Sequence, residues 1–447
     1  MKNSADFTHG KIMPALIKFA LPVLFAIFLQ TMYGAVDMII VGRFGSAADV
    51  SAVSTGSWVM QTITSAIVGI AMGTTILIGQ KIGEQQMNEI GGVIGASICM
   101  FAVFGVAVTI IVELLATHIT SWMHAPEEAF EGTVRYISIC SGGSIFIVAY
   151  NVLGSVFRGI GNSKIPLMTV AIACAANIIG DLILVGLFKM GVAGAAIATV
   201  FAQAISVFLS VIIIRKMSMP FEIKPEDVRF SMTAIKAVIK LGTPIAFQDV
   251  LVSVSFLVIN AIVNSLGVVA SAGVGVAEKI CGFVLLVPSA YMQSMSAFVA
   301  QNIGAACYSR ARRALLCAIT TSLCAGVFLS YISFFHGNVL AGVFSNDSTV
   351  IFAAAEYLKS YAIDCLLVSF LFSFIGYFNG CGKTFFVMIQ GILGAFCVRI
   401  PVSYFMSRIE PVSLFKVGIA TPASTVVQIL LCLVFFFGVY RSDLQKR

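Results

Sequence analysis

Two oxygen-bearing side chains lie four residues apart inside a long apolar segment, which runs from about Leu167 to Phe188. On a helix, Asn177 and Asp181 would lie one turn apart on the same face. An ionised carboxylate at membrane depth costs about 2.5 to 3.5 kcal/mol on insertion scales, so such a residue is by default functional. The spacing therefore predicts that Asp181 takes part in binding a cation.

The composition predicts a polytopic membrane protein. Of the 447 residues, 59% are hydrophobic and only 11% are charged, and the mean hydropathy is +1.01. Apolar runs recur along the whole chain, and a helix needs about 20 such residues to cross the hydrocarbon core of a bilayer. The predicted fold is all-α, with about twelve transmembrane helices joined by short loops.

The positive charges indicate how the chain crosses the membrane. Most of the 27 Lys and Arg residues fall on segments that face the cytoplasm if the N-terminus lies inside. By the positive-inside rule, both termini are predicted to be cytoplasmic. The net charge of +7 is therefore attributed to contacts with membrane lipid, and no nucleic-acid partner is expected. The 11 Cys and 4 His residues lack metal-ligand spacing, so neither a structural metal nor a cofactor is expected.

Landmarks of the first half of the sequence recur in the second half at a nearly constant offset, with a slip of a single position. The matching positions are Lys18 and Lys240, Pro22 and Pro244, Gln80 and Gln301, Gly83 and Gly304, Gly159 and Gly380, and Gly161 and Gly382. Such repeats indicate an internal duplication. Because each copy holds an even number of spans, the copies are expected to be parallel repeats with the substrate path between them.

The duplication sets the expected domain boundaries. We predict a first lobe at 1–214, a cytoplasmic linker at 215–240 and a second lobe at 241–447. The predicted spans are 22–41, 50–80, 92–117, 135–157, 167–188 and 195–214 in the first lobe, and 241–266, 268–300, 314–335, 357–378, 385–406 and 417–440 in the second. Pro22, near the start of the first span, is predicted to bend that helix.

The acidic residues of the first lobe have no acidic counterparts in the second. Asp37 lies in the outer third of the first span, and the repeat places Ile259 at the corresponding position. Asp181 corresponds to the neighbourhood of Val402 and Ser403. The carboxylate cluster was therefore not duplicated.

The second lobe carries intramembrane charges of its own, which are Asp249, Glu278, Asp364 and Arg399. We expect Glu278 and Arg399 to be structural charges or interfacial anchors rather than ligands. Asp364 is kept as a candidate residue of the substrate cavity.

The chain resembles the multidrug and toxic compound extrusion (MATE) transporters over nearly its whole length. The resemblance is carried by the twelve-span duplicated plan, the stretch 22–37, and the motifs at 80–83, 301–305 and 158–162. Each motif is short, but the set occurs in order at fixed spacing. Other branches of the family use a Glu on the seventh helix. This chain has Gln248 and Asp249 there instead, which leaves an ion site in the second lobe without its usual acid.

In the branch that the chain resembles most, the resemblance implies a cation site in the first lobe. Its residues here would be Asp37, Asn177, Asp181 and Thr199, with Tyr33 as a cavity residue and Asn151 as a further candidate. Asp37, Asp181 and Thr199 fall in the outer parts of their predicted helices, so they can meet at one depth. Two carboxylates with amide and hydroxyl oxygens form an oxygen-only site that suits Na⁺ or a proton, and the sequence leaves both open.

These features predict a secondary active multidrug efflux antiporter that works as a monomer by alternating access. It would export lipophilic organic cations in exchange for inward H⁺ or Na⁺, because carboxylates and a chain with 36 Phe and 18 Met residues suit aromatic cations. Each charge that moves inward gains about 2.3 kcal/mol per 100 mV.

Two other classes were weighed. A lipid-linked saccharide flippase, or an exporter of another endogenous metabolite, could use the same fold, but a flippase should line its cavity with Arg and Lys. The helix interiors of the first lobe contain neither. A membrane enzyme is not expected, because 380–384 resembles the end of a phosphate loop but has Tyr377 where the first Gly should be.

Overall fold

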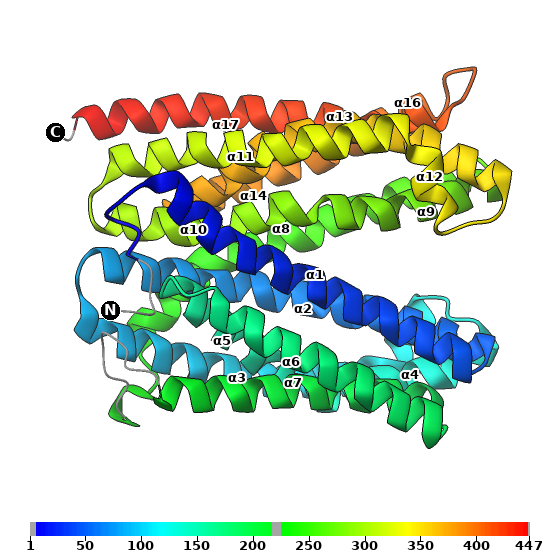
Figure 1. The fold of residues 1–447 in the computed structure, drawn as a ribbon, viewed down its shortest axis with the longest axis horizontal. Coiled ribbons are helices and arrows are strands. Elements are labelled where there is room, and N and C mark those ends of the chain that lie inside the picture. The colour runs from blue at the N-terminus through cyan, green and yellow to red at the C-terminus, as the bar shows by residue number, and fades with distance from the viewer. Residues whose placement is uncertain (1–5, 217–224, 446–447) are drawn as a thin grey trace. The chain divides into compact units, whose positions relative to one another are not determined.

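The computed structural model describes residues 6–216 and 225–445 of the chain (Figure 1). Helices make up 88% of the structure, and no strand occurs in the two described ranges. Ten described helices are long and apolar enough to cross a membrane, and two bent helix pairs raise the number to as many as 12. The predicted all-α fold with about twelve spans is confirmed.

The first half of the chain holds seven α-helices and one π-helical segment. They are α1 (Ile12–Phe44), α2 (Ala47–Gly83), α3 (Met87–Trp122), α4 (Glu127–Gly142), α5 (Ser144–Gly159), α6 (Lys164–Asp181), the π-helix η1 (Leu182–Leu187) and α7 (Gly191–Lys216).

The second half follows the same general order with more interruptions. It holds the short 3-10 helix η2 (Pro225–Asp227), α8 (Met232–Asn264), α9 (Val268–Val284), α10 (Leu286–Gly304), α11 (Tyr308–Phe335), α12 (Gly337–Gly342), α13 (Ser348–Gly380), α14 (Thr384–Ile392), the π-helix η3 (Leu393–Arg399), α15 (Ile400–Met406), α16 (Leu414–Gly418) and α17 (Ala420–Gln445).

The chain divides into two compact units. Unit 1 comprises Met1–His9, Lys18–Ala246 and Ala300–Ala306, and unit 2 comprises Gly10–Ile17, Phe247–Val299 and Cys307–Arg447. Helix α8 begins inside the predicted linker 215–240, and its first part belongs to unit 1. Gly69 and Gly73 explain this packing, because a side chain at either glycine would overlap the backbone of α8. Residues 217–224 of the predicted linker lie outside the described residues.

Two predicted spans are broken rather than continuous. Span 135–157 is the pair α4 and α5, which bend by 55°. The break falls at Gly143, where a Cβ would overlap Val200 of α7. Span 268–300 is the pair α9 and α10, which bend by 40°. The sequence predicts each of them as one helix, because hydropathy reports the length of an apolar run and not its axis.

Helix α1 begins at Ile12, well before the predicted span 22–41, and continues without a break to Phe44. Pro22 lies in its interior. A proline there removes one backbone hydrogen bond of the helix, and the predicted bend at Pro22 stays a prediction.

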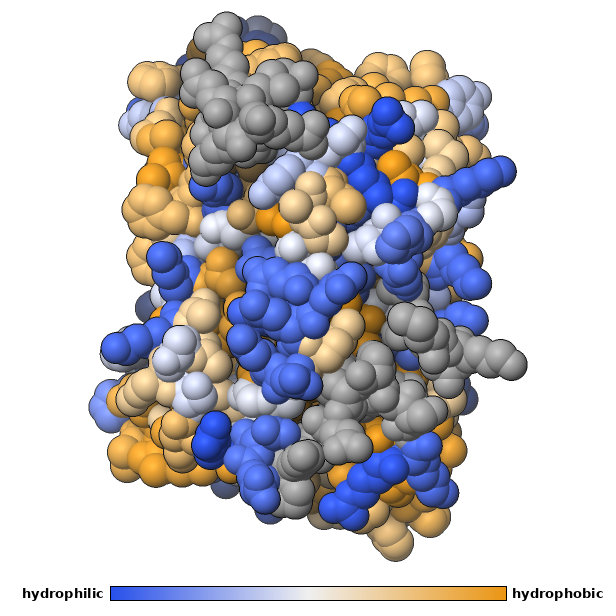
Figure 2. Space-filling view, turned by 90° about the vertical axis from the view of Figure 1, so that its left-hand side faces the viewer, coloured by the Kyte–Doolittle hydropathy of each residue, from blue (hydrophilic) through white to orange (hydrophobic). Residues whose placement is uncertain are grey.

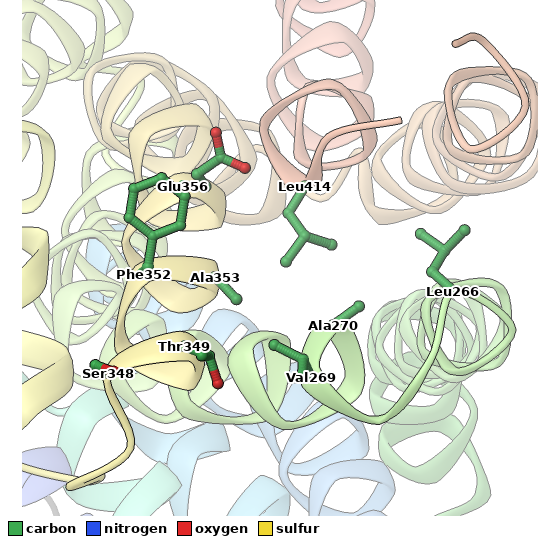
Figure 3. Close-up of a pocket in the computed structure, with 9 residues that line it drawn as sticks. All are labelled: Leu266, Val269, Ala270, Ser348, Thr349, Phe352, Ala353, Glu356 and Leu414. Atoms are coloured by element: carbon green, nitrogen blue, oxygen red, sulfur yellow. The ribbon is translucent and has the colours of Figure 1, made fainter. Parts of the chain in front are cut away.

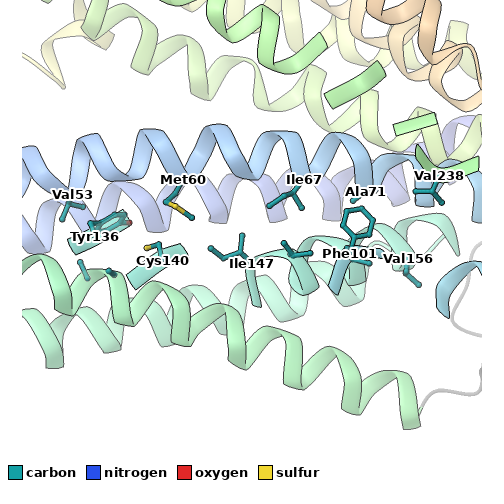
Figure 4. Close-up of a cluster of buried hydrophobic side chains, with 14 of the residues drawn as sticks. Val53, Met60, Ile67, Ala71, Phe101, Tyr136, Cys140, Ile147, Val156 and Val238 are labelled. Carbon is teal, nitrogen blue, oxygen red and sulfur yellow. The ribbon is translucent and has the colours of Figure 1, made fainter. Parts of the chain in front are cut away.

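The interior of unit 1 is packed with apolar side chains. Figure 4 shows Val53, Met60 and Ile67 along α2, facing side chains of α4 and α5 such as Tyr136 and Ile147. These contacts hold the helices that carry polar residues in a fixed register. Burial of each large apolar side chain contributes about 1.5 to 3 kcal/mol relative to exposure to water.

The two copies of the Gln-x-x-Gly motif meet within unit 1. A Cβ at Gly83 would overlap the carbonyl of Gln301, and a Cβ at Gly304 would overlap the carbonyl of Gln80. The Gln301 side chain also donates a hydrogen bond of 3.2 Å to the carbonyl of Gly159. The motifs that recur in the sequence are therefore positions where backbones approach too closely for any side chain.

The surface has the character expected of a multi-pass membrane protein. Large apolar side chains remain exposed, and Leu114 and Val434 are each 74% exposed. Figure 2 shows hydrophobic side chains at the surface beside hydrophilic ones. A soluble monomer rarely exposes apolar surface on this scale, whereas lipid tails cover it at no cost.

Candidate cation site

Three helices of unit 1 bring the four predicted cation ligands together. Asp37 comes from α1, Asn177 and Asp181 from α6, and Thr199 from α7. The Thr199 hydroxyl donates to Oδ2 of Asp37 at 3.2 Å, and Nδ2 of Asn177 donates to Oγ1 of Thr199 at 3.4 Å. The carboxyl groups of Asp37 and Asp181 are close enough to interact electrostatically. Both acids are buried, and Asp181 has no exposed surface.

Small residues explain why α6 and α7 can approach so closely at this point. Gly180 precedes Asp181, and a Cβ added to Gly180 would lie 3.0 Å from the Cβ of Ala198, which precedes Thr199. Small residues at such contacts let helix backbones approach in a membrane. Directly after Asp181 the helix changes to the π-helix η1, a feature that is frequent at functional sites.

The cluster has more hydrogen-bond acceptors than donors. Oδ1 of Asp37, Oδ1 of Asn177 and both carboxylate oxygens of Asp181 are buried and have no hydrogen-bond partner. Two adjacent carboxylates cannot satisfy each other unless a proton or a cation lies between them. The described residues contain no cluster of three or more His, Cys, Asp or Glu side chains that could hold a metal. The site therefore suits one proton or a hard monovalent cation bound by oxygen.

A small cavity adjoins the cluster. Its free volume is about 10 Å³, roughly the space of one water molecule. The lining residues are Tyr33, Tyr150, Val170, Ala173, Asn177, Thr199, Ala202 and Gln203. A cavity for a drug-sized ligand measures about 300 to 1,000 Å³, so these helices must separate before such a molecule can reach the acids.

The cavity includes two polar residues that the sequence analysis missed. Gln203 follows Thr199 by one turn of α7, and that spacing is a signal that could have found it. Tyr150 accepts a hydrogen bond from the side chain of Gln30 on α1. The predicted cavity residue Tyr33 does line the cavity. Asn151 does not line it, and its amide donates instead to the carbonyl of Ile147 on its own helix, at 2.8 Å.

The charges predicted in the second half lie in unit 2 and take no part in this cluster. Asp364 is buried on α13, beside Thr425 and within the electrostatic range of Arg399. Arg399 is only 6% exposed, which favours a structural charge over an interfacial anchor. Asp249 is half-buried on α8, and Glu278 of α9 accepts a hydrogen bond of 3.2 Å from Asn260.

Comparison with known proteins identifies the family of the chain. The MatE family model matches residues 22–183 and again residues 244–405, which together make up more than half of the sequence. The chain belongs to the MatE family. Members of this family are transporters and not enzymes, as the sequence predicted. The two MatE matches have equal length and begin at Pro22 and Pro244, a pair of the repeat, which supports the predicted internal duplication.

Several MATE relatives cover most of the chain. A probable multidrug resistance protein of Bacillus subtilis, YoeA, is 24% identical over 96% of this chain and 93% of its own length. The multidrug export protein MepA of Staphylococcus saprophyticus is 24% identical over 90% of this chain and 88% of its own.

Solved MATE structures share the fold. A multidrug resistance MATE transporter of the MOP superfamily in an outward-facing conformation matches with a TM-score of 0.91 and 21% identity, over 99% of this chain and 98% of that one. A MOP superfamily transporter from Pyrococcus furiosus also matches with a TM-score of 0.91, at 20% identity, over 99% of this chain and 98% of that one. For that protein, the reverse polarity of the binding pocket suggests a different function.

Proposed function

We propose that the chain is a secondary active multidrug efflux antiporter of the bacterial inner membrane, which exports lipophilic organic cations in exchange for inward H⁺ or Na⁺. The observation that carries this proposal is the pair of buried acids Asp37 and Asp181, because Oδ1 of Asp37 and both carboxylate oxygens of Asp181 lack hydrogen-bond donors. The names of the relatives as multidrug resistance and export proteins support the substrate class.

The exchange of ion for substrate follows because the coupling ion and the cationic substrate compete for the negative charge of the cluster. A proton or Na⁺ that enters the cluster neutralises one carboxylate and supplies the donor or the cation that the unpartnered oxygens lack. A cationic substrate is then held less strongly. Coupling requires only that the ion and the substrate favour different conformations of the transporter. The small volume of the adjoining cavity is consistent with a state that holds the ion and not the substrate.

The same proposal includes topology and assembly. Both termini would lie in the cytoplasm and the transporter would act as a monomer in contact with membrane lipid. Lys2, Arg441, Lys446 and Arg447 were part of the positive-inside argument. Residues 1–5 and 446–447 and the Arg441 side chain lie outside what the structure describes.

The test is transport of the fluorescent cation ethidium into proteoliposomes, first under an imposed pH gradient and then under a Na⁺ gradient. Wild-type protein should accumulate ethidium under one gradient and not without it, which identifies the coupling ion. Asp181→Asn should lose this uptake, because the amide keeps the shape but not the charge. Glu131→Gln, which removes an exposed carboxylate of α4 far in sequence from the cluster, should transport normally.

Two results would overturn the proposal. Uptake that ignores both gradients would favour a lipid-linked saccharide flippase or an exporter of another endogenous metabolite. The buried Arg399 of unit 2 is the observation that keeps the flippase under test, because a flippase needs a basic group for pyrophosphate. Normal gradient-driven uptake by Asp181→Asn would leave the antiporter class intact and remove the cluster from its mechanism.

A further inference from the structure

A larger cavity, of about 530 Å³, lies in unit 2. It is found where α8 ends and where α9, α13 and α16 begin (Figure 3). The lining residues are Leu266, Val269, Ala270, Ser348, Thr349, Phe352, Ala353, Glu356 and Leu414. We call it the unit 2 pocket. Its size is in the range of small-molecule sites, and none of the four cation-site residues of unit 1 contributes to it.

The wall of the unit 2 pocket is mostly apolar. Figure 3 shows Val269, Ala270, Ala353 and Leu414 around the central space, with the ring of Phe352 at one side. Phe352 is 63% exposed, so its ring is available to a ligand. Such a wall binds a lipophilic molecule by removing apolar surface from water.

Of the polar residues that line the pocket, Ser348, Thr349 and Glu356, Thr349 is already engaged. The Thr349 hydroxyl donates to Oδ1 of Asp347 at 2.7 Å, and the Thr349 backbone N–H donates to the same oxygen at 2.8 Å. These hydrogen bonds from Thr349 lower the pKa of the Asp347 carboxyl, which caps α13. Asp347 therefore stays negatively charged beside the rim, and its Oδ1 accepts hydrogen bonds at the start of α13.

Glu356 is the one charged side chain among the described residues that line the pocket. Its carboxylate forms no hydrogen bond or ion pair within 6–216 and 225–445, and so none with Lys359, which follows one turn later on α13. The basic residue nearest to Leu414 in sequence, Lys416, donates instead to the carbonyl of Pro411 at 2.7 Å. An apolar, aromatic wall with one unpaired carboxylate is complementary to a lipophilic monovalent cation. An anion would be repelled, and a neutral molecule would leave the charge unpaired.

We propose that the unit 2 pocket binds a lipophilic organic cation, with Glu356 as its counter-charge and Phe352 as its aromatic contact. The inference rests on the proposed function for the class of ligand. With both termini in the cytoplasm, as predicted, the ends of the helices that form the pocket face outside. The pocket would then hold the exported cation on the release side, separately from the ions bound at Asp37 and Asp181.

A local readout can test binding at this pocket alone. A cysteine introduced by Val269→Cys is treated with an uncharged maleimide in detergent, and labelling of that position is measured by peptide mass spectrometry, which separates it from the native cysteines. Tetraphenylphosphonium should slow this labelling about fivefold or more. Val268→Cys provides the matched control, because Val268 is the preceding residue, is 85% exposed and does not line the pocket.

The charge requirement is tested in the same assay. Glu356→Gln in the Val269→Cys background should reduce protection by tetraphenylphosphonium to less than about twofold, whereas Glu131→Gln should leave it unchanged. Ala270→Phe, which fills the pocket and keeps the charge, should also abolish protection. Triphenylphosphine oxide, an uncharged molecule of similar shape, should protect weakly.

Several outcomes would overturn the inference. They are absence of protection by tetraphenylphosphonium, equal protection in Glu356→Gln, equal protection by triphenylphosphine oxide, or protection by short-chain phosphatidylethanolamine, which would assign the pocket to lipid. The assay uses no ion gradient. Its failure is therefore distinct from failure of the antiporter proposal, which is tested by gradient-driven uptake and Asp181→Asn.

Discussion

In unit 1, the buried acids Asp37 and Asp181 share a site with an amide and a hydroxyl, and no described basic side chain is a partner of either acid. In unit 2, the buried acid Asp364 lies within the electrostatic range of Arg399. Under the proposed function, the first cluster takes a cation from solution to balance its charge. The other contains a cation that is covalently part of the chain.

Because the two halves of the chain are repeats, the two units can be compared position by position. The nearest repeat pairs, Gly159 with Gly380 and Gly161 with Gly382, place Asn177 opposite Val398, the residue before Arg399, and Asp181 opposite Val402. Asp37 corresponds to Ile259, a buried residue of the apolar core of unit 2. The duplicated segment therefore keeps the frame of helices, has no acid at the positions of Asp37 and Asp181, and carries a basic residue, Arg399, close to the position of Asn177. We conclude that the duplicated helices tolerate a buried charge of either sign, and that the side chains of each unit determine its ion chemistry.

The partners of Arg399 show how unit 2 accommodates a buried charge. Its guanidinium donates to Oγ of Ser255 at 3.1 Å and lies 4.5 Å from the centre of the Phe256 ring. Breaking a buried pair by removal of one partner leaves an uncompensated charge. Unit 2 should therefore depend on its internal cation for folding, whereas unit 1 should depend on its acids for transport.

The strongest test of this contrast is Arg399→Leu. The substitution removes the charged hydrogen bond to Ser255 and leaves Asp364 without its basic neighbour, so it should reduce stability by about 1.5 to 3 kcal/mol. Thermal unfolding of the purified protein in detergent measures the change. Arg408→Leu is the matched control, because Arg408 is exposed and contacts the Tyr404 ring at 4.8 Å. Equal losses for the two variants would show that Arg399 has no special structural role.

Close packing of α6 and α7 is the next feature to test. Gly180→Ala places a methyl group 3.0 Å from the Cβ of Ala198, so the helices must separate by a few tenths of an ångström at the level of Asp181. We expect the apparent affinity for the coupling ion to fall about tenfold, or about 1.4 kcal/mol.

Gly186→Ala on the same span is the control for Gly180→Ala. A Cβ at Gly186 would lie 3.5 Å from the Phe44 ring, an ordinary contact. The ion affinity is read from the gradient dependence of ethidium uptake. Equal affinities in the two variants would mean that the distance between α6 and α7 does not tune the site.

The sequence predicted the four residues of the cation cluster but not the residues around them. Asp37 and Asp181 stood out because a carboxylate in an apolar run has few reasons to be there other than function. Asn177 lies one turn before Asp181, and Thr199 was implied by the family resemblance. Tyr150 lines the cavity and Asn151 does not, although they are neighbours. One residue corresponds to about 100° of helix rotation, and the rotation of α5 is set by tertiary packing.

The two helix breaks and the boundary between the units could not be predicted from the sequence, for a related reason. The bend at Gly143 depends on the contact with Val200, and the membership of the first part of α8 in unit 1 depends on Gly69 and Gly73. These contacts join positions far apart in the chain. Hydropathy predicts where an apolar segment lies, and only packing determines what it packs against.

Removal of one acid from the unit 1 cluster should raise the stability of the protein, whereas removal of Arg399 should lower it. Asp37→Asn eliminates one of two adjacent buried charges, and the new amide can donate to Asp181 while its oxygen still accepts from Thr199. Stability in detergent should rise by about 1 kcal/mol, the value of one hydrogen bond, although coupled transport is lost. A fall in the unfolding temperature comparable to that of Arg399→Leu would contradict the difference between the units.

The smallest effect is expected at Thr199, whose hydroxyl lies between Asp37 and Asn177. Thr199→Val removes a donor to Asp37 at 3.2 Å and an acceptor from Asn177 at 3.4 Å, while the volume of the side chain is nearly unchanged. The carboxylates remain, so ion affinity should fall only about threefold, or roughly 0.7 kcal/mol. Thr199→Ser keeps the hydroxyl and should restore the wild-type value. If Thr199→Ser is as impaired as Thr199→Val, the methyl group and its packing matter more than the hydroxyl. If neither variant changes affinity, the ion is bound by the two carboxylates without Thr199.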